Sequence, residues 1–191
     1  MITADKTFLR SYYKKKRLSL TNQEIDHLSH EVYKQLEKLN IWTLKHYHIF
    51  ISIKKNNELD TSLVINKLKS KQKKIIVPKI SNNELIHLAI NEKTEFSLNH
   101  YGIVEPNDGD CFKIENLDII FIPLLVFDLE GHRVGYGKGY YDSFLKLTKS
   151  STLKIGLSLF DPIYKIEDIN NNDIKLDYCI TPTQVHKFNN I

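Results

Sequence analysis

The segment EGHRVGYGKGYYD, residues 130–142, concentrates the residue types from which a phosphate site is built. It holds four of the chain's seven glycines together with Arg133, Lys138 and Asp142. Glycines let a backbone approach a phosphate closely and adopt positive φ angles, and the two cations would neutralise its charge. Asp142 would either cap a following helix or hold a magnesium ion through one oxygen. The segment therefore predicts phosphate binding, with a purely structural glycine turn as the alternative.

Two common nucleotide-binding motifs do not fit this spacing. A dinucleotide fingerprint needs its third glycine at the position of Tyr140. A Walker A loop needs Ser or Thr after its lysine, whereas Lys138 is followed by Gly139. The composition thus favours phosphate, but the pattern is neither of these two loops.

The residues on either side of the glycine segment predict a strand before it and a helix after it. Residues 117–123 are apolar except for Asp118, which is typical of a strand buried on both faces. Helical spacing resumes from Tyr141 to Leu147. In open α/β sheets, ligands bind where strands end and helices begin, and the free N–H groups of a helix N-terminus suit phosphate. The segment is therefore expected at the ligand-binding edge of a sheet.

Helix signals occur in three further places. Residues 4–17 have apolar residues on one side, and Thr21 with Glu24 forms a capping box that begins a second helix. A third helix is expected after Asp60 or Thr61, either of which would cap it.

Strand signals alternate with these helices. Strands are expected at residues 47–53, 74–78 (ended by Pro78), 84–90 (antiparallel or at an edge), 153–159 and 178–181. The alternation predicts a three-layer α/β/α Rossmann-like single domain over residues 1–191, with a mainly parallel sheet.

Composition is that of an ordinary globular protein. The chain has 191 residues, is 41% hydrophobic and 26% charged, and has a net charge of +4. No apolar run approaches the roughly 18 residues of a membrane span, and no apolar signal core begins the chain. We therefore expect a cytoplasmic protein without a membrane partner. The basic stretches at 14–17 and 69–74 are expected to be solvated.

The stretch DIIFIPLLVFDLEGHRVGYGKGYYDSFL, residues 118–145, resembles the signature of the 5-formyltetrahydrofolate cyclo-ligase family. Similar stretches are KTFLR (6–10), IFISIKKNNELDT (49–61), YGIVEP (101–106) and NNDIKLD (171–177), so the resemblance covers essentially the whole chain. It implies conversion of 5-formyltetrahydrofolate to 5,10-methenyltetrahydrofolate, with ATP as co-substrate and Mg²⁺ as cofactor. The formyl oxygen would be phosphorylated before the ring closes.

The resemblance also implies which residues act. Lys138 would contact the transferred phosphate and Arg133 would make a phosphate contact, and these two would be the catalytic residues. Asp142 and Asp173 would hold the metal. The implied ATP-binding residues are Lys6, Arg10, Arg133, Val134, Gly135, Tyr136, Gly137, Lys138, Gly139, Tyr140 and Tyr141. The implied folate-binding residues are Ile51, Glu58, Tyr136, Gly137, Lys138, Gly139 and Tyr140.

Without the resemblance, the residues also allow interpretations in which they have only structural or solvent-exposed roles. Lys6 and Arg10 would belong to a basic helix face, Glu58 would be a solvated loop acid, and Asp173 a turn residue. The tyrosines would be packing residues.

Two other function classes compete with the cyclo-ligase. One is a related, non-catalytic protein that binds a nucleotide or RNA on the same fold, motivated by the basic N-terminus. The other is a sugar-phosphate or acyl-transfer enzyme, for which no catalytic base stands in a glycine-flanked loop. The intact set of Arg133, Lys138 and Asp142 favours the cyclo-ligase. We therefore expect folate and ATP as partners and no nucleic acid, with a monomer as the assembly and a dimer as its alternative.

Overall fold

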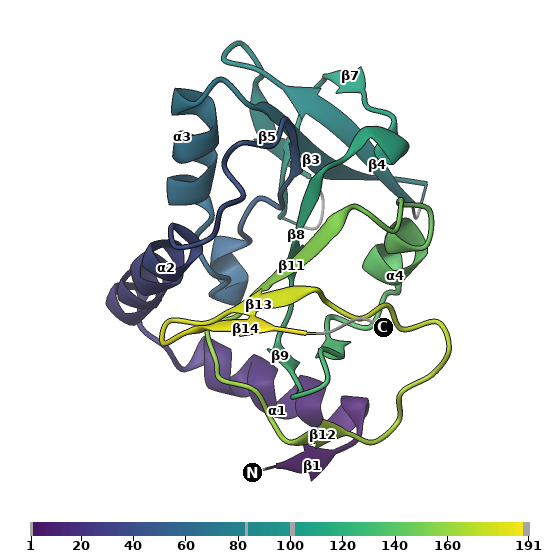
Figure 1. Ribbon diagram of the computed structural model, residues 1–191. Coiled ribbons are helices and arrows are strands. Elements are labelled where there is room, and N and C mark those ends of the chain that lie inside the picture. The colour runs from purple at the N-terminus through teal and green to yellow at the C-terminus, as the bar shows by residue number, and fades with distance from the viewer. Residues whose placement is uncertain (1, 83, 100–101, 189–191) are drawn as a thin grey trace.

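An eight-stranded sheet forms the centre of the computed structural model, which describes residues 2–82, 84–99 and 102–188 (Figure 1). The five strands from β13 to β3 run parallel, and the pairs at both edges are antiparallel. The predicted mainly parallel sheet is therefore confirmed. In spatial order the strands are β14 (Val185–Lys187), β13 (Tyr178–Ile180), β11 (Leu153–Leu157), β8 (Ile119–Pro123), β2 (His46–His48), β3 (Lys74–Ser81), β4 (Glu84–Ile90) and β7 (Asp110–Cys111).

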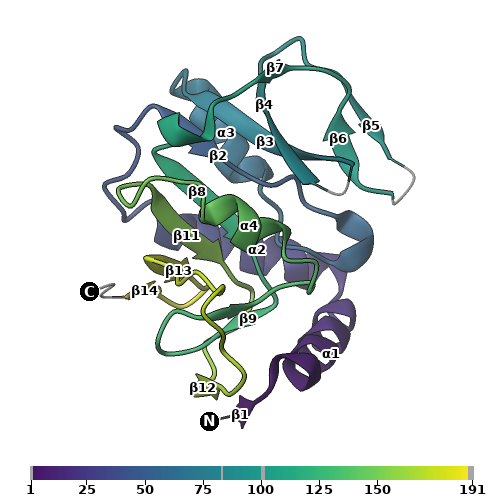
Figure 2. The same ribbon diagram turned by 90° about the vertical axis from the view of Figure 1, so that its right-hand side faces the viewer.

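Helices cover both faces of this sheet (Figures 1 and 2). α2 (Asn22–Leu36) and α3 (Ser62–Ser70) pack on one face against a core that includes Phe121. α4 (Tyr140–Leu145) packs on the other face, where the alternate side chains of β8 point. The three layers agree with the predicted architecture, although the layer containing α4 is thin.

A separate helix, α1 (Lys6–Leu18), lies beyond the carboxyl ends of the parallel strands (Figure 1). It packs on β9 (Val126–Phe127) and β10 (Arg133–Val134) through a third apolar core that includes Leu9. Next to its start, β1 (Thr3–Ala4) pairs with β12 (Lys165–Ile166) in parallel. The N-terminal segment is therefore held at the end of the sheet where ligands bind in α/β folds.

The order of the parallel strands creates a crevice between β2 and β8. β2 is the first of these strands in the chain, and its successor β3 lies on one side of it. The later strands β8, β11 and β13 follow one another on the other side. Chain segments that leave β2 and β8 therefore diverge, and such a switch point is where open α/β sheets bind ligands.

The helix expected over residues 4–17 begins at Lys6, whereas the predicted start of the second helix is confirmed by its cap. The Asp5 side chain accepts a hydrogen bond from the backbone N–H of Phe8, at 2.8 Å, and so begins α1. Thr21 and Glu24 form the expected capping box of α2. At α3, Thr61 is the N-cap without a side-chain bond, while Asp60 Oδ1 accepts from Ser62 N at 2.8 Å.

Three predicted boundaries are wrong. The strand at 47–53 ends at His48, because the Ser52 hydroxyl bonds the carbonyl of Leu59 and turns the chain into a loop. β3 continues through Pro78 to Ser81, since β2 pairs only with its first three residues and a proline is tolerated beside an open edge. α4 stops at Leu145, which leaves the Leu147 side chain exposed.

The remaining elements are short and were not predicted. They are the hairpin β5 (Phe96–Leu98) with β6 (Val104–Pro106) and the 3₁₀ turns η1 (Lys54–Asn56) and η2 (Ile114–Asn116). Within the described ranges, no helix has both the length and the apolar character needed to cross a membrane.

Gly156 in β11 tests the packing between the sheet and the α4 side. A Cβ atom there would lie 2.7 Å from methyl carbons of both Leu124 and Leu176, and 3.1 Å from Cys179 Sγ. We expect Gly156→Ala to lower the free energy of unfolding by about 1–3 kcal/mol through overpacking, measured by denaturant titration. Gly135→Ala is the matched control, because its Cβ would have no neighbour within 4 Å. Equal unfolding midpoints for the two variants would contradict the packing on this face.

Candidate active site

The glycine loop, residues 135–139, lies next to the crevice between β2 and β8. After β8 ends at Pro123, the chain forms the antiparallel β9–β10 hairpin and then enters the loop. α4 begins directly afterwards at Tyr140. The predicted setting, after a central buried strand and before a helix, is confirmed. Because α4 has only six residues, side chains and loop N–H groups must supply most of the positive charge that a phosphate would need.

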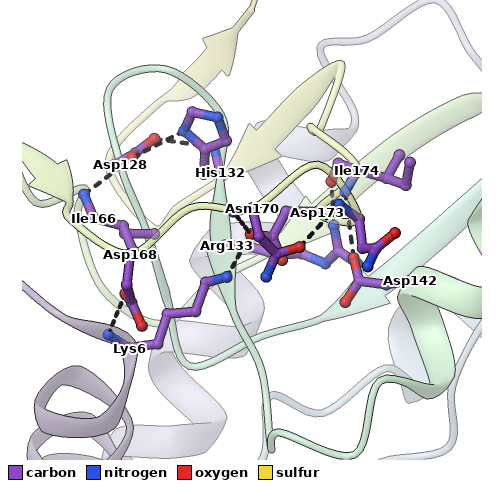
Figure 3. Close-up of polar contacts among 11 residues, drawn as sticks. Lys6, Asp128, His132, Arg133, Asp142, Ile166, Asp168, Asn170, Asp173 and Ile174 are labelled. Atoms are coloured by element: carbon purple, nitrogen blue, oxygen red, sulfur yellow. Dashed lines mark hydrogen bonds and ion pairs between the residues drawn. The ribbon is translucent and has the colours of Figure 1, made fainter.

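Asp128 is fully buried, and its carboxylate organises the turn between β9 and β10 (Figure 3). Oδ1 accepts hydrogen bonds from the backbone N–H groups of Glu130 and His132, both at 3.0 Å. Oδ2 lies 3.1 Å from His132 Nδ1 and accepts from the backbone N–H of Ile166 at 3.2 Å. These four contacts hold the turn in one conformation, and so they set the direction in which Arg133 leaves it.

Arg133 joins its own strand to the nearby helix α4 and to the segment around Ile174, which is distant in the sequence (Figure 3). Its Nη2 forms an ion pair with Asp142 Oδ1 at 2.7 Å, and its Nη1 donates to the carbonyl of Ile174. The Ile174 N–H in turn donates to the same Asp142 oxygen at 3.3 Å. The alternative role of Asp142 as a helix cap is wrong, because α4 is capped by Gly139 without any side-chain bond.

Lys6 and Asp173 form a second ion pair beside the first (Figure 3). The backbone N–H of Lys6 also donates to Asp168 Oδ1 at 2.7 Å, so the start of α1 is tied to the segment before Asp173. Asp173 is a turn residue as well, because its Oδ2 accepts from Asn170 N at 2.8 Å. One oxygen each of Asp173 and Asp142 has no hydrogen-bond partner among the described residues.

Arg10 crosses the glycine loop directly. Its Nε donates to the carbonyl of Gly135 at 3.1 Å. A Cβ atom on Gly137 would lie 3.0 Å from the guanidinium carbon of Arg10, and Gly137 has a φ of 86°. Both the close approach and the left-handed backbone require glycine at this position. Arg10 therefore supports the glycine loop and is more than one residue of a basic helix face.

Glu58 and Tyr136 meet on the other side of the loop. The Tyr136 hydroxyl donates to Glu58 Oε1, and Glu58 Oε2 accepts from the backbone N–H of Ile53 at 2.9 Å. Glu58 is only 5% exposed, so its interpretation as a solvated loop acid is wrong. Burial raises the pKa of Glu58, while the Tyr136 and Ile53 hydrogen bonds and the charge of Arg17 oppose that rise.

Arg17 is the site residue that the sequence reasoning missed. It belongs to the basic stretch 14–17, yet it is 4% exposed, and its Nη2 donates to the Tyr136 hydroxyl. A signal was present, because Leu9, Tyr13 and Arg17 stand four residues apart and so share one helix face. The apolar character of the first two predicts that this face is buried.

The other predicted site residues occupy different environments. Lys138 is exposed at the loop tip and has no partner among the described residues, whereas the Val134 side chain is buried in the core beneath α1. Ile51 and Tyr140 are half-buried. The Tyr141 hydroxyl is buried without a hydrogen-bond partner, and burial and the nearby Glu58 charge raise its pKa.

The structure therefore gathers the predicted residues into two groups that the glycine loop connects. Lys6, Arg133, Asp142 and Asp173 form the first group, and Glu58 and Tyr136 form the second, which also includes Arg17. The first group combines cations and carboxylates, as a metal-bound phosphate requires. The second offers a buried carboxylate, which suits a ligand with paired N–H donors.

The model of the 5-formyltetrahydrofolate cyclo-ligase family matches residues 2–182. The chain belongs to this family. Among its relatives, the 5-formyltetrahydrofolate cyclo-ligase of Mycoplasma genitalium is 35% identical over 185 residues, which span 92% of this chain and 97% of that protein.

Solved structures agree with this membership. The 5,10-methenyltetrahydrofolate synthetase of Aquifex aeolicus superposes with a TM-score of 0.83 at 29% identity, over 97% of this chain and 94% of that one. The Mycoplasma pneumoniae synthetase has a TM-score of 0.73, at 24% identity and over 93% and 99% of the two chains, and supports the fold.

Replacing the turn carboxylate tests how the cyclo-ligase loop is supported. In Asp128→Asn the amide NH₂ would face a hydrogen-bond donor where the carboxylate accepts one, so we expect a loss of about 1–3 kcal/mol in unfolding free energy. Denaturant titration measures this loss, and Asp108→Asn, at an exposed position, should show none. A fully stable Asp128→Asn variant would contradict the supporting role of the turn.

Proposed function

We propose that this chain converts 5-formyltetrahydrofolate to 5,10-methenyltetrahydrofolate, with ATP as the co-substrate. The chain is a 5-formyltetrahydrofolate cyclo-ligase by family, and its relatives carry that name. One observation carries the site assignment: α1, the glycine loop and the segment around Asp173 bring cations and carboxylates together at the switch point of the sheet.

The reaction has to turn a poor leaving group into a good one. An amide-like formyl oxygen does not leave readily, whereas a phosphorylated one does. The γ-phosphoryl group is transferred to the formyl oxygen, and ADP is released. The second folate nitrogen then attacks the formyl carbon and loses its proton, and the C–O bond breaks to release phosphate. Such chemistry needs positioning and charge neutralisation rather than a nucleophilic side chain.

On the ATP side, the protein supplies cations that differ in exposure and in whether they form ion pairs. Arg133 and Lys6 are held in ion pairs, Arg10 braces the loop, and Lys138 stands exposed and unpaired among the described residues. Lys138 is therefore the cation that can move onto the transferred phosphate. Backbone N–H groups of residues 134–141 complete the cradle around the phosphates.

On the folate side, Glu58 is the recognition group. A buried carboxylate pairs well with the two N–H donors of a pterin's amino edge, and Glu58 is fixed by Ile53 and Tyr136. By the family resemblance we also assign Ile51, Gly137, Gly139 and Tyr140 to the folate, and the side chains of Ile51 and Tyr140 are half-buried.

Asp142 and Asp173 are the residues that would hold Mg²⁺. Each keeps one carboxylate oxygen without a partner among the described residues, which fits a metal bound by one or two carboxylates together with substrate phosphates. When bound, the ion neutralises phosphate charge. Until then, Arg133 and Lys6 balance the two carboxylates.

Several predictions from the sequence stay predictions. These are the cytoplasmic location, the single domain over residues 1–191, the monomeric state with a dimer as alternative, and the expectation of no nucleic-acid or membrane partner.

Lys138→Ala tests the ATP side. Loss of the mobile cation should lower kcat by roughly 10²-fold or more, in the range seen when one transition-state contact is removed. Turnover is measured as the near-ultraviolet absorbance of the methenyl product, with ATP, Mg²⁺ and 5-formyltetrahydrofolate. Lys149→Ala removes the same charge from an exposed position beyond α4 and should be normal. Normal turnover of Lys138→Ala would remove Lys138 from this role.

A wild-type protein that makes no product but retains RNA with a steep salt dependence would instead favour the non-catalytic alternative.

Asp142→Asn tests the metal assignment. Weaker metal binding should raise the Mg²⁺ concentration at half-maximal rate by roughly 10-fold or more, and Asp173→Asn should act in the same direction. A Mg²⁺ titration of the absorbance assay measures both. Asp110→Asn, at an exposed residue in β7, is the control. An unchanged titration in both site variants would reduce these aspartates to structural ion-pair partners.

A further inference from the structure

Arg17 differs from the other cations of the α1 basic stretch. Lys14, Lys15 and Lys16 are exposed, whereas Arg17 is buried to 4% exposure. Its guanidinium carbon lies 5.3 Å from the Tyr136 ring centroid, and its Nη2 donates to the hydroxyl of the same tyrosine. Burying a guanidinium is costly unless its charge is compensated, so this placement requires a nearby anion.

Glu58 is that anion, and the Tyr136 hydroxyl links the two groups. The hydroxyl accepts from Arg17 and donates to Glu58 Oε1. A second link runs through the neighbouring residue, because the Asn57 side chain donates to the carbonyls of Arg17 at 3.2 Å and Leu20 at 2.8 Å. The end of α1 and the segment that carries Glu58 are thus fixed to each other by both backbone and side chains.

The surroundings of Arg17 and Glu58 indicate that the link between these two residues also has a functional role. Arg17 and Glu58 are the charged residues of a pocket where β2, β8 and β11 end, and its other lining residues are apolar, Phe50 and Leu125 among them. Arg17 Nε is buried there and has no hydrogen-bond partner among the residues that the structure describes. In such surroundings a carboxylate without a nearby cation would take up a proton.

We infer that Arg17 is a positioning residue for the cyclo-ligase reaction: acting directly and through the Tyr136 hydroxyl, it keeps Glu58 a carboxylate, aligned to accept the N–H donors of the folate. This inference rests on the proposed role of Glu58 in folate binding. A protonated Glu58 would present an O–H donor to those N–H groups and would lose one of the two hydrogen bonds.

The direction of the pH effect follows from the groups that face Glu58. They are Arg17 from α1, Tyr136 from the glycine loop, Tyr141 from α4 and the backbone N–H of Ile53. Burial raises the pKa of Glu58, and Arg17 opposes that rise. Without Arg17, Glu58 would stay protonated to higher pH, so folate binding would be weakest at low pH and would recover as the pH rises.

Arg17→Met is the first test, with KM for 5-formyltetrahydrofolate and kcat measured from roughly pH 6 to pH 9 by the absorbance assay. We expect KM near neutral pH to rise by about 10- to 100-fold, the loss of a hydrogen bond to a charged group. KM should then fall toward the wild-type value as the pH rises, with a smaller change in kcat. Arg17→Lys should restore the wild-type pH profile, and Lys15→Met, from the same helix turn, should match the wild type.

Tyr136→Phe covers the case in which Arg17→Met does not fold, judged by circular dichroism. It removes only the linking hydroxyl, whose hydrogen bond also opposes the rise in the pKa of Glu58, and we expect a pH-dependent rise in KM in the same direction. Folded variants with a wild-type KM at every pH would overturn the inference while leaving the proposed function intact. A wild-type protein with no turnover would instead overturn the proposed function.

Discussion

The ion pair between Arg133 and Asp142 holds the active-site end of this protein together. A loop with three glycines in five residues has little conformational preference of its own. It needs anchors on both sides, and Arg133 and Asp142 flank it in the chain. Because both also bond Ile174, the C-terminal segment that carries Asp173 is drawn to the same point. This three-way contact brings Arg133, Asp142 and the segment before Lys175 together in the first group of site residues.

Charge is balanced within the site by its own residues. Lys6 pairs with Asp173, Arg133 with Asp142, and Arg17 with Glu58 through a tyrosine. Buried or half-buried charges are tolerated in such pairs because their mutual attraction and their hydrogen bonds offset part of the desolvation cost. An incoming triphosphate and metal ion would form new pairs with groups that are already oriented. Preorganisation of this kind lets electrostatic stabilisation act without rearrangement during the reaction.

Much of the fold followed from local sequence patterns, whereas the roles of most site residues were predicted only from the family resemblance. Capping residues and helical periods predicted α1 and α2, and the apolar run predicted the central strand β8. The glycine segment was placed correctly between a strand and a helix because those patterns flank it.

Features that depend on contacts between residues far apart in the chain did not follow from local sequence patterns. In the sequence, Arg17 looks like one more exposed charge of its basic stretch. Its burial depends on Tyr136 and Glu58, which lie much later in the chain. Pro78 normally ends a strand, and only the short length of its neighbour β2 lets β3 continue. The β9–β10 hairpin depends on a buried aspartate whose partners include Ile166, far along the chain. Local propensity carries no information about the contacts of Pro78 and of the hairpin, and for Arg17 only its spacing from Leu9 and Tyr13 indicates a buried helix face.

Transfer of the phosphoryl group to the formyl oxygen of the folate can be followed by labelling that oxygen with a heavy isotope, in a single turnover with ATP and Mg²⁺. If this site phosphorylates that oxygen, the label appears in the released inorganic phosphate, analysed by mass spectrometry, in step with formation of the methenyl product. Product formation with unlabelled phosphate, and the heavy oxygen in water, would contradict this transfer.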